Sequence, residues 1–173
     1  MIINRVWAMP SAWTFTIKPI KELLSRYVDD GIGWIDPFAG KNSPARFRND
    51  LNKEYDAEYH YDAIEFCELL HACKDYSDFK GVLFDPPYSY RQISEHYKAI
   101  GRKATRLDTS ANFYSKIKDS LAPLIPTGGY AISFGWNSNG FGKKRGFEIE
   151  EILLVAHGVQ HNDTIVTVEK KIK

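Results

Sequence analysis

The sequence predicts an α/β domain, in which helices pack on a mainly parallel sheet that has one antiparallel edge strand. Short apolar strands alternate with helical patterns along most of the chain. The last two predicted strands, 150–157 and 164–170, are joined by a turn at 161–163 and predict a closing hairpin. The length of 173 residues, with 43% hydrophobic and 26% charged residues, fits a single domain spanning 1–173.

The first predicted helix covers 16–27, where apolar residues recur at helical spacing, with Thr14 or Thr16 as the candidate cap. A short apolar strand at 33–36 then runs into a loop. The further predicted strands are 45–49, 59–61, 81–84 and 130–134, and the further predicted helices are 62–73 and 110–121.

Composition excludes several classes of protein. The longest uncharged apolar stretch near the C-terminus, 152–156, is far short of the roughly 20 residues that span a bilayer, and the N-terminus lacks the apolar region of a secretory signal. Cys67 and Cys73 lie six apart in one predicted helix, which places them on different faces and predicts free thiols in a reducing cytosol. His157 and His161 have no third ligand nearby, so we expect no metal site.

The most informative tetrapeptide is Asp85-Pro86-Pro87-Tyr88, which follows an apolar strand at the edge where open α/β sheets bind ligands. The two prolines fix two φ angles and remove two N–H donors, so the loop is stiff and presents the Pro86 carbonyl as an acceptor. Such a carboxylate and carbonyl can accept both hydrogens of a planar amino group, while Tyr88 stacks on the ring that carries it. The alternative is a rigid turn after a strand.

A second motif, Asp36-Pro37-Phe38-Ala39-Gly40, also follows a short apolar strand. Gly40 lets the backbone approach a ligand closely, and the exposed amides of such a loop can meet a carboxylate.

With these two motifs in this order, the chain resembles the S-adenosylmethionine-dependent amino-methyltransferases, which methylate exocyclic amino groups of nucleic-acid bases. The resemblance implies a Rossmann-like methyltransferase with a seven-stranded sheet in a three-layer sandwich, and it assigns catalysis to the residues of the first motif. In that family the loop at 36–40 cradles the methionine part of the cofactor. The family usually has glycine at the position of Asn42, which indicates a reshaped loop here.

Two acidic residues lie where such a fold needs them. Asp50, after the strand 45–49, could accept from the ribose hydroxyls, and Asp62, after the strand 59–61, from the amino group of the cofactor's adenine. The alternative for each is a solvated or helix-capping carboxylate. The resemblance also implies that the segment before the first helix covers the carboxylate end of the cofactor, although a helix cap explains it equally well. The cofactor-binding candidates in that segment are Pro10, Ser11, Thr14 and Phe15.

Charge is distributed unevenly, although the formal net charge is only +1. The segment 50–78 has nine acidic and two basic residues, whereas 89–106 has five basic and one acidic, and 143–145 is wholly basic. Both basic clusters follow predicted strands, so we expect them to rim the active-site edge and contact nucleic-acid phosphates. The polar segment 135–140 would lie beside the catalytic loop. The candidate nucleic-acid-binding residues are Arg91, Lys98, Arg102, Lys103, Arg106, Asn137, Lys143, Lys144 and Arg145.

The resemblance therefore predicts a cytoplasmic DNA adenine-N6 methyltransferase that uses S-adenosylmethionine and needs no metal or membrane, because Asp at the first catalytic position is more typical of the adenine enzymes. The alternatives are an RNA base amino-methyltransferase and a catalytically silent subunit that binds nucleic acid. Since no separate target-recognition domain is evident, selectivity would come from the basic loops, from a homodimer or from a separate specificity partner.

Overall fold

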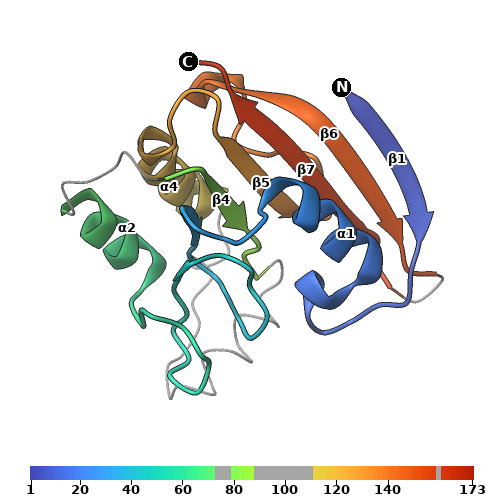
Figure 1. Ribbon diagram of the computed structural model, residues 1–173, viewed down its shortest axis with the longest axis horizontal. Coiled ribbons are helices and arrows are strands. Elements are labelled where there is room, and N and C mark those ends of the chain that lie inside the picture. Colours follow the sequence, from blue (N-terminus) through green and yellow to red (C-terminus); the bar gives the residue numbers. More distant parts are fainter. Residues whose placement is uncertain (73–78, 88–110, 159–160) are drawn as a thin grey trace.

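Seven strands form one sheet in the order β1-β6-β7-β5-β4-β2-β3 (Figure 1). The computed structural model describes residues 1–72, 79–87, 111–158 and 161–173. The strands are β1 (Ile2–Trp7), β2 (Trp34–Asp36), β3 (Phe47–Arg48), β4 (Gly81–Phe84), β5 (Tyr130–Gly135), β6 (Phe147–Ala156) and β7 (Thr164–Lys171). The described helices are α1 (Lys18–Tyr27), α2 (Ala63–Ala72) and α4 (Ala111–Leu121), with the 3-10 turns η1 (Thr14–Thr16), η3 (Ala122–Leu124) and η4 (Lys143–Arg145).

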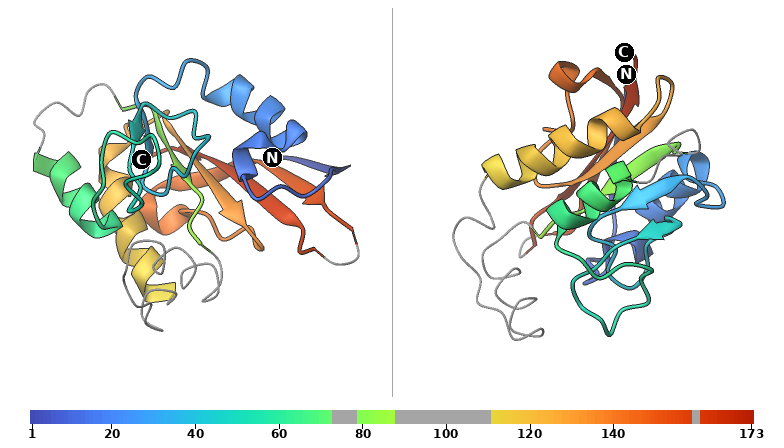
Figure 2. Two further views of the ribbon diagram at one scale, coloured as in Figure 1. Left: turned by 90° about the horizontal axis from the view of Figure 1, so that it is seen from below. Right: turned by 90° about the vertical axis from the view of Figure 1, so that its left-hand side faces the viewer.

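Helices lie on both faces of the sheet, so the predicted three-layer α/β fold class is confirmed (Figure 2). α1 packs its buried stripe of Ile20, Leu23 and Leu24 in a core on one face, which also holds Leu83 of β4. Val82, the preceding residue of β4, belongs to the opposite core with α2 and α4, as the two-residue period of a strand requires.

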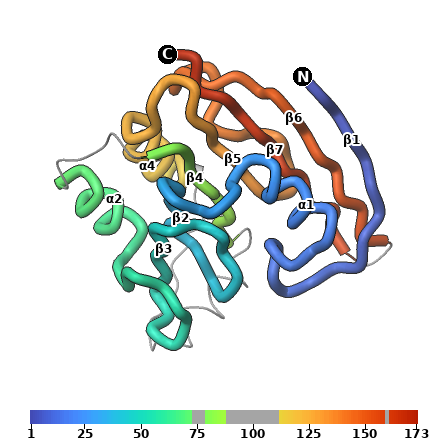
Figure 3. Tube along the Cα trace, in the orientation of Figure 1, coloured from blue at the N-terminus to red at the C-terminus, as the bar shows by residue number. Residues whose placement is uncertain are grey.

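The sheet is mainly parallel, and only β7 runs antiparallel to its neighbours. β7 lies inside the sheet between β5 and β6, so the edge position that we expected for the antiparallel strand is wrong. Its residues Val166, Thr167 and Val168 are buried on both faces, which suits an interior strand. The two edges are formed instead by β1, at the N-terminal end of the tube in Figure 3, and by β3.

The first helix begins later than predicted. It starts at Lys18 with Pro19 in its first turn, and Ile17 at the N-cap position makes no side-chain cap bond. Thr14 and Thr16 lie in η1 instead, so neither of them caps the helix.

The predicted strands before α2 are shorter than expected. The strand expected at 45–49 is reduced to the two residues of β3, and the one at 59–61 to a single bridge between Asn49 and Tyr59. Asn49 explains this, because its buried side chain accepts from Tyr61 N at 2.9 Å and donates to Tyr61 O at 3.0 Å. A side chain thus replaces the backbone ladder that would have continued the strand.

α1 is tied to the sheet by a carboxylate. Glu151 of β6 is almost fully buried, and it accepts from Arg26 Nη2 and from Tyr27 Oη, both at 2.8 Å. The hydrogen bond from Arg26 holds the pKa of Glu151 below its usual range, and burial raises the pKa of Tyr27. This link fixes the helix that follows the predicted cofactor-covering segment.

The histidines and cysteines have structural surroundings. His157 is buried, with Nδ1 2.9 Å from Ala8 O and Nε2 2.9 Å from Thr164 Oγ1, and His161 is exposed. Cys67 is a buried free thiol, while Cys73 lies outside the described residues. Within the described ranges, no group of three His, Cys, Asp or Glu side chains could hold a metal ion, and no helix is long and apolar enough to cross a membrane.

Candidate functional site

The two predicted motifs lie side by side at the carboxyl edge of the sheet. β2 and β4 are adjacent parallel strands, with Ile35 opposite Val82, and Asp36 ends the first while Asp85 follows the second. The Asp85 charge is close enough to raise the pKa of Asp36. The structure thus brings together the segments that the sequence singled out 45 residues apart.

Asp36 shapes the loop from within the protein. It is fully buried, and it accepts from Ser43 Oγ at 2.6 Å and from Phe38 N at 2.9 Å. Burial raises the pKa of Asp36 to about 8, the charges of Asp85 and Asp50 add to this, and the two hydrogen bonds oppose it. Pro37 is buried as well. Neither residue therefore exposes surface to a ligand, and both shape the loop instead of contacting the cofactor as predicted.

The backbone amides of the loop are already bonded. Phe38 N donates to Asp36, Ala39 N donates to Asn49 O at 2.9 Å, and Gly40 N donates to Asp50 Oδ2 at 2.9 Å. The expectation that exposed amides at these three positions meet a carboxylate is therefore wrong, because neighbouring side chains and backbone satisfy them. An anionic ligand group would need another donor.

Asp50 and Asp62 each have a structural role. Asp50 is half-buried, and besides Gly40 N it binds Asn52 N at 2.8 Å through Oδ1. Asp62 Oδ1 accepts from Ile64 N at 3.0 Å, and its own N–H donates to Glu65 Oε2 at 3.3 Å, which is a capping arrangement at the start of α2. A carboxylate has about four acceptor positions, so both groups keep capacity for a ligand.

The predicted covering segment divides into inward and outward parts. Phe15 is buried and meets Phe134 of β5 edge-to-face, with ring centroids 5.2 Å apart. Ser11 Oγ lies 2.9 Å from Thr16 Oγ1 and accepts from Trp13 N at 3.1 Å, which fixes the turn. Thr14 and Pro10 are half-buried beside it.

Trp13 is the residue of this segment that lies against the motif loop, and sequence reasoning missed it. A methyl group built on Gly40 would lie 3.5 Å from the Trp13 ring, and Gly40 has a φ of 55°, which favours glycine. The local signal was only an aromatic residue just ahead of a helix.

A cation and two rings form a small cluster beside this contact, the Lys41 cluster (Trp13, Lys41 and Tyr55). The rings meet edge-to-face at 5.8 Å, and Lys41 Nζ lies 5.3 Å from the Trp13 centroid and 5.4 Å from that of Tyr55. Lys41 is exposed at this point, so its ammonium is available to an anion. The sequence separates these residues, and no local pattern joins them.

α4 supports the loop after β4. Pro86 is buried, Asp85 and Pro87 are half-buried, and Tyr114 Oη donates to Pro87 O at 2.5 Å. Phe38 of the other motif contacts the Tyr114 ring at 6.3 Å between centroids, and also the ring of Phe84 at 5.5 Å. Tyr88, predicted to stack on the substrate, lies outside the described residues.

Lys118 of α4 holds the loop after β5 in place through its ammonium group. Its Nζ donates to Asn139 O at 3.0 Å and Gly140 O at 2.9 Å, and it lies 4.9 Å from the centroid of Phe84. Burial lowers the pKa of this lysine to about 8. Asn137 is exposed near the carboxyl end of β5, and its Oδ1 accepts from Asn139 N.

The basic cluster at 143–145 does not rim the active-site edge, and that expectation is wrong. η4 leads directly into β6, whose first residues lie at the amino edge, where Gly146 O accepts from Ile172 N beyond the end of β7. The chain after β5 therefore runs back from the carboxyl edge of the sheet to the amino edge before it reaches η4. Arg145 is also paired with Asp119 at 2.8 Å, while Lys143 and Lys144 are exposed. The remaining basic candidates lie outside the described residues: Arg91, Lys98, Arg102, Lys103 and Arg106.

Comparison with known proteins places this geometry in a fold. No protein-family model and no curated protein matches the chain. Among solved structures, TrmN from Thermus thermophilus matches with a TM-score of 0.55 and 17% identity, over 90% of this chain and 49% of TrmN. The chain thus spans about half the length of that protein. TrmN is a methyltransferase of Rossmann-like fold, and the chain described here has that fold.

Proposed function

We propose that this protein is an S-adenosylmethionine-dependent methyltransferase that methylates the N6 amino group of adenine in DNA. The observation that carries the proposal is the adjacency of the Asp85-Pro86-Pro87 loop and the 36–40 loop at the carboxyl edge of β2 and β4. Open α/β sheets bind their ligands at that edge. The likeness in fold to a methyltransferase supports the same class of reaction.

The residues around the 36–40 loop fit the chemical groups of the cofactor. The Trp13 ring lies against Gly40, and the exposed ammonium of Lys41 beside it is the donor that a carboxylate needs where the loop amides are taken. Asp50 and Asp62 offer acceptor positions to ribose hydroxyls and to an adenine amino group. When bound, S-adenosylmethionine supplies an electrophilic methyl group.

The loop after β4 would position the target base. Flipping the adenine out of a duplex costs a few kcal/mol, after which its amino group donates to Asp85 and to the Pro86 carbonyl. The Pro87 carbonyl is already bonded to Tyr114, so it does not compete. The amino nitrogen would accept the methyl group that bound S-adenosylmethionine supplies, with S-adenosylhomocysteine as the leaving group, and Asp85 or water would take the amino proton that must leave. Positioning and electrostatics supply the rate enhancement.

Asp85→Asn tests this assignment, because it keeps the shape of the side chain and removes the charge. We expect methyl transfer to a DNA oligonucleotide to fall at least about 100-fold, with the calorimetric affinity for S-adenosylmethionine unchanged. Asp119→Asn, at an exposed carboxylate on α4, is the matched control and should keep full activity. Full turnover by the Asp85 variant would overturn the catalytic role, and absence of cofactor binding by the unchanged protein would favour a catalytically silent subunit.

RNA is the second candidate substrate, because the structural neighbour TrmN is a tRNA methyltransferase. The same loop could receive an unpaired RNA base without the cost of flipping. Competing DNA and RNA oligonucleotides of matched sequence in one methyl-transfer assay separate the two. Preferential labelling of DNA is the expected result, and preferential labelling of RNA would replace the DNA assignment while keeping the enzyme class.

A further inference from the structure

The outer edge of the sheet is formed by β1, which is unusually apolar for an edge strand. Of the described elements, only β6 pairs with it. Ile2 is 54% exposed, Ile3 58% and Trp7 65%, and Arg5 is its one charged residue. Edge strands in monomers are normally protected by several charges, proline, bulges or short length, because an open apolar edge pairs with another strand.

The outward backbone groups of β1 can be assigned. Ala8 N donates to Ala156 O at 3.0 Å, so the N–H of this even-numbered position points toward β6. Backbone groups alternate along a strand, and therefore the N–H and C=O groups of Ile3, Arg5 and Trp7 point away from the sheet. These are the groups that a further strand would bind.

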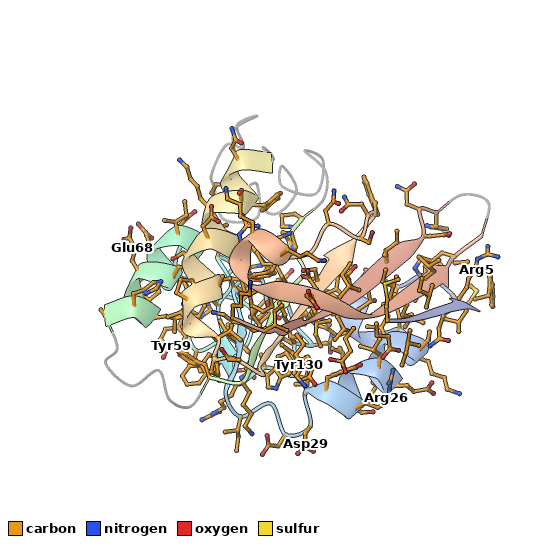
Figure 4. The ribbon with its side chains drawn as sticks, turned by 90° about the horizontal axis from the view of Figure 1, so that it is seen from above. Arg5, Arg26, Asp29, Tyr59, Glu68 and Tyr130 are labelled. Atoms are coloured by element: carbon orange, nitrogen blue, oxygen red, sulfur yellow. The ribbon has the colours of Figure 1, made fainter. Side chains whose placement is uncertain are left out.

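The side chains of β1 also divide between two faces. Ile2 pairs in parallel with Glu151, which bonds to α1, so Ile2, Asn4 and Val6 share the face covered by α1. Figure 4 places Arg5 on the side of the sheet away from Arg26 of α1. Both faces of the strand thus present apolar groups at the edge.

We propose that β1 pairs antiparallel with β1 of a second copy of this chain, with Asn4 opposite Asn4 of the second copy at the two-fold axis. A two-fold axis perpendicular to the sheet keeps the same face of both copies on the same side. Residues directly opposite each other must then have side chains on the same face, so the axis passes through a pair of identical residues and not between two pairs. With Asn4 at the centre, Ile2 lies opposite Val6, and Ile3 lies opposite the aliphatic stem of Arg5. A centre at Arg5 would place two guanidinium groups opposite each other, which destabilises a ladder.

This arrangement continues the sheet through the dimer. Since β1 is parallel to β6 and antiparallel to its copy, the carboxyl edges of the two sheets face in opposite directions. The two candidate sites therefore lie far from the two-fold axis and open in opposite directions, and neither completes the other. The proposal is independent of the reaction that the site performs.

Cysteine crosslinking tests both the dimer and its register. The backbone N–H and C=O groups of the even-numbered residues point toward β6, so the two central Asn4 residues form a non-hydrogen-bonded pair. Their Cα atoms would lie about 4.5 Å apart, within the range that a disulfide bridges. Asn4→Cys should form a covalent dimer under mild oxidation, whereas Arg5→Cys and the unchanged chain should not. Crosslinking through Arg5→Cys but not Asn4→Cys would overturn the register, and crosslinking of neither would overturn the dimer.

A charge test in solution gives the same information without a new covalent bond. Ile3→Arg places arginines opposite Arg5 twice in the dimer, and should convert it to a monomer in sedimentation velocity at micromolar concentration. Ile3→Glu removes the same side chain but creates two opposite-charge pairs, and should leave the mass that of a dimer. Circular dichroism confirms that both variants are folded. A monomeric unchanged chain, or monomers for both variants, would overturn the proposal.

Discussion

The hydroxyl of Tyr114 on α4 donates a hydrogen bond to the carbonyl oxygen of Pro87, across 2.5 Å. Pro87 cannot donate through its own nitrogen, so this bond fixes the loop from its carbonyl side. In the proposed reaction the neighbouring carbonyl, that of Pro86, is the acceptor beside Asp85. Helix α4 thereby positions the backbone that the proposed reaction depends on.

Tyr114→Phe should slow methyl transfer without weakening the binding of S-adenosylmethionine. Loss of the hydroxyl frees the Pro87 carbonyl and loosens the loop, so we expect kcat to fall roughly tenfold, which is about 1.4 kcal/mol. The free energy of unfolding should fall by about 1 kcal/mol. Tyr61→Phe, at an exposed tyrosine, is the control. An unchanged kcat together with the loss of stability would restrict Tyr114 to a structural role.

Asp36 predicts a pH dependence of stability. Its pKa is about 8 in the folded protein because the side chain is buried, compared with about 4 in an unfolded chain. Between these values the folded state holds a proton that the unfolded state has lost, so the free energy of unfolding should decrease as the pH rises from about 4 to about 8.

Asp36→Asn should remove that dependence, because the amide keeps hydrogen-bonding partners in Phe38 and Ser43 and does not titrate. Urea unfolding between pH 5 and pH 8 measures it, with Asp30→Asn at an exposed turn as the control. The unchanged protein should lose more stability over this range than the Asp36 variant. Parallel curves for the two proteins would show that Asp36 is ionised throughout.

Asp62→Asn separates helix capping from cofactor binding. Asparagine caps a helix as well as aspartate does, so the thermal midpoint should stay within a few degrees of that of the unchanged chain. Removing the charge should weaken S-adenosylmethionine binding about fivefold in calorimetry if the carboxylate accepts from the adenine amino group. Unchanged affinity would leave the capping bond to Ile64 as the sole role of Asp62.

Two glycines in the loop after β5 should respond differently to alanine. A Cβ at Gly140 would collide with the buried carboxylate of Glu169, which already binds the amides of Phe141 and Gly142. We expect Gly140→Ala to lower the free energy of unfolding by about 3 kcal/mol. At Gly142 no atom lies within 4 Å of such a Cβ, and only the backbone conformation opposes alanine. Its φ of 80° with a ψ of 168° lies in a region essentially confined to glycine, which costs about 1 to 2 kcal/mol. Equal losses in urea unfolding would contradict the packing that we describe.

Local pattern was sufficient for the strands that carry the motifs. The four apolar residues of β4 stop at Asp85-Pro86-Pro87, so the predicted and observed bounds agree. It was insufficient for β1, whose exposed residues follow no two-residue alternation. Nor could it place η4, because the direction in which a loop crosses the sheet depends on distant contacts such as that of Lys118 with Gly140.

The same limit applies to the candidate site. The sequence identified Asp36 and Asp85 from their neighbours in the chain, and both lie at the carboxyl edge. It did not identify Trp13, Lys41 or Tyr114, because each acts through a partner more than ten residues away. Burial likewise changed the role of Asp36, and a sequence pattern does not report burial at a strand end.

The interior position of β7 has a consequence for how the chain is made. Among the seven described strands, β7 follows the other six along the chain, yet it joins β5 to β6, so until it is synthesised the sheet is two separate halves. The half with β2, β3, β4 and β5 holds both motif loops, while the half with β1 and β6 anchors α1 through Glu151. Nascent chains that end before 164 should therefore expose the apolar edges of both halves and depend on chaperones until β7 has been made.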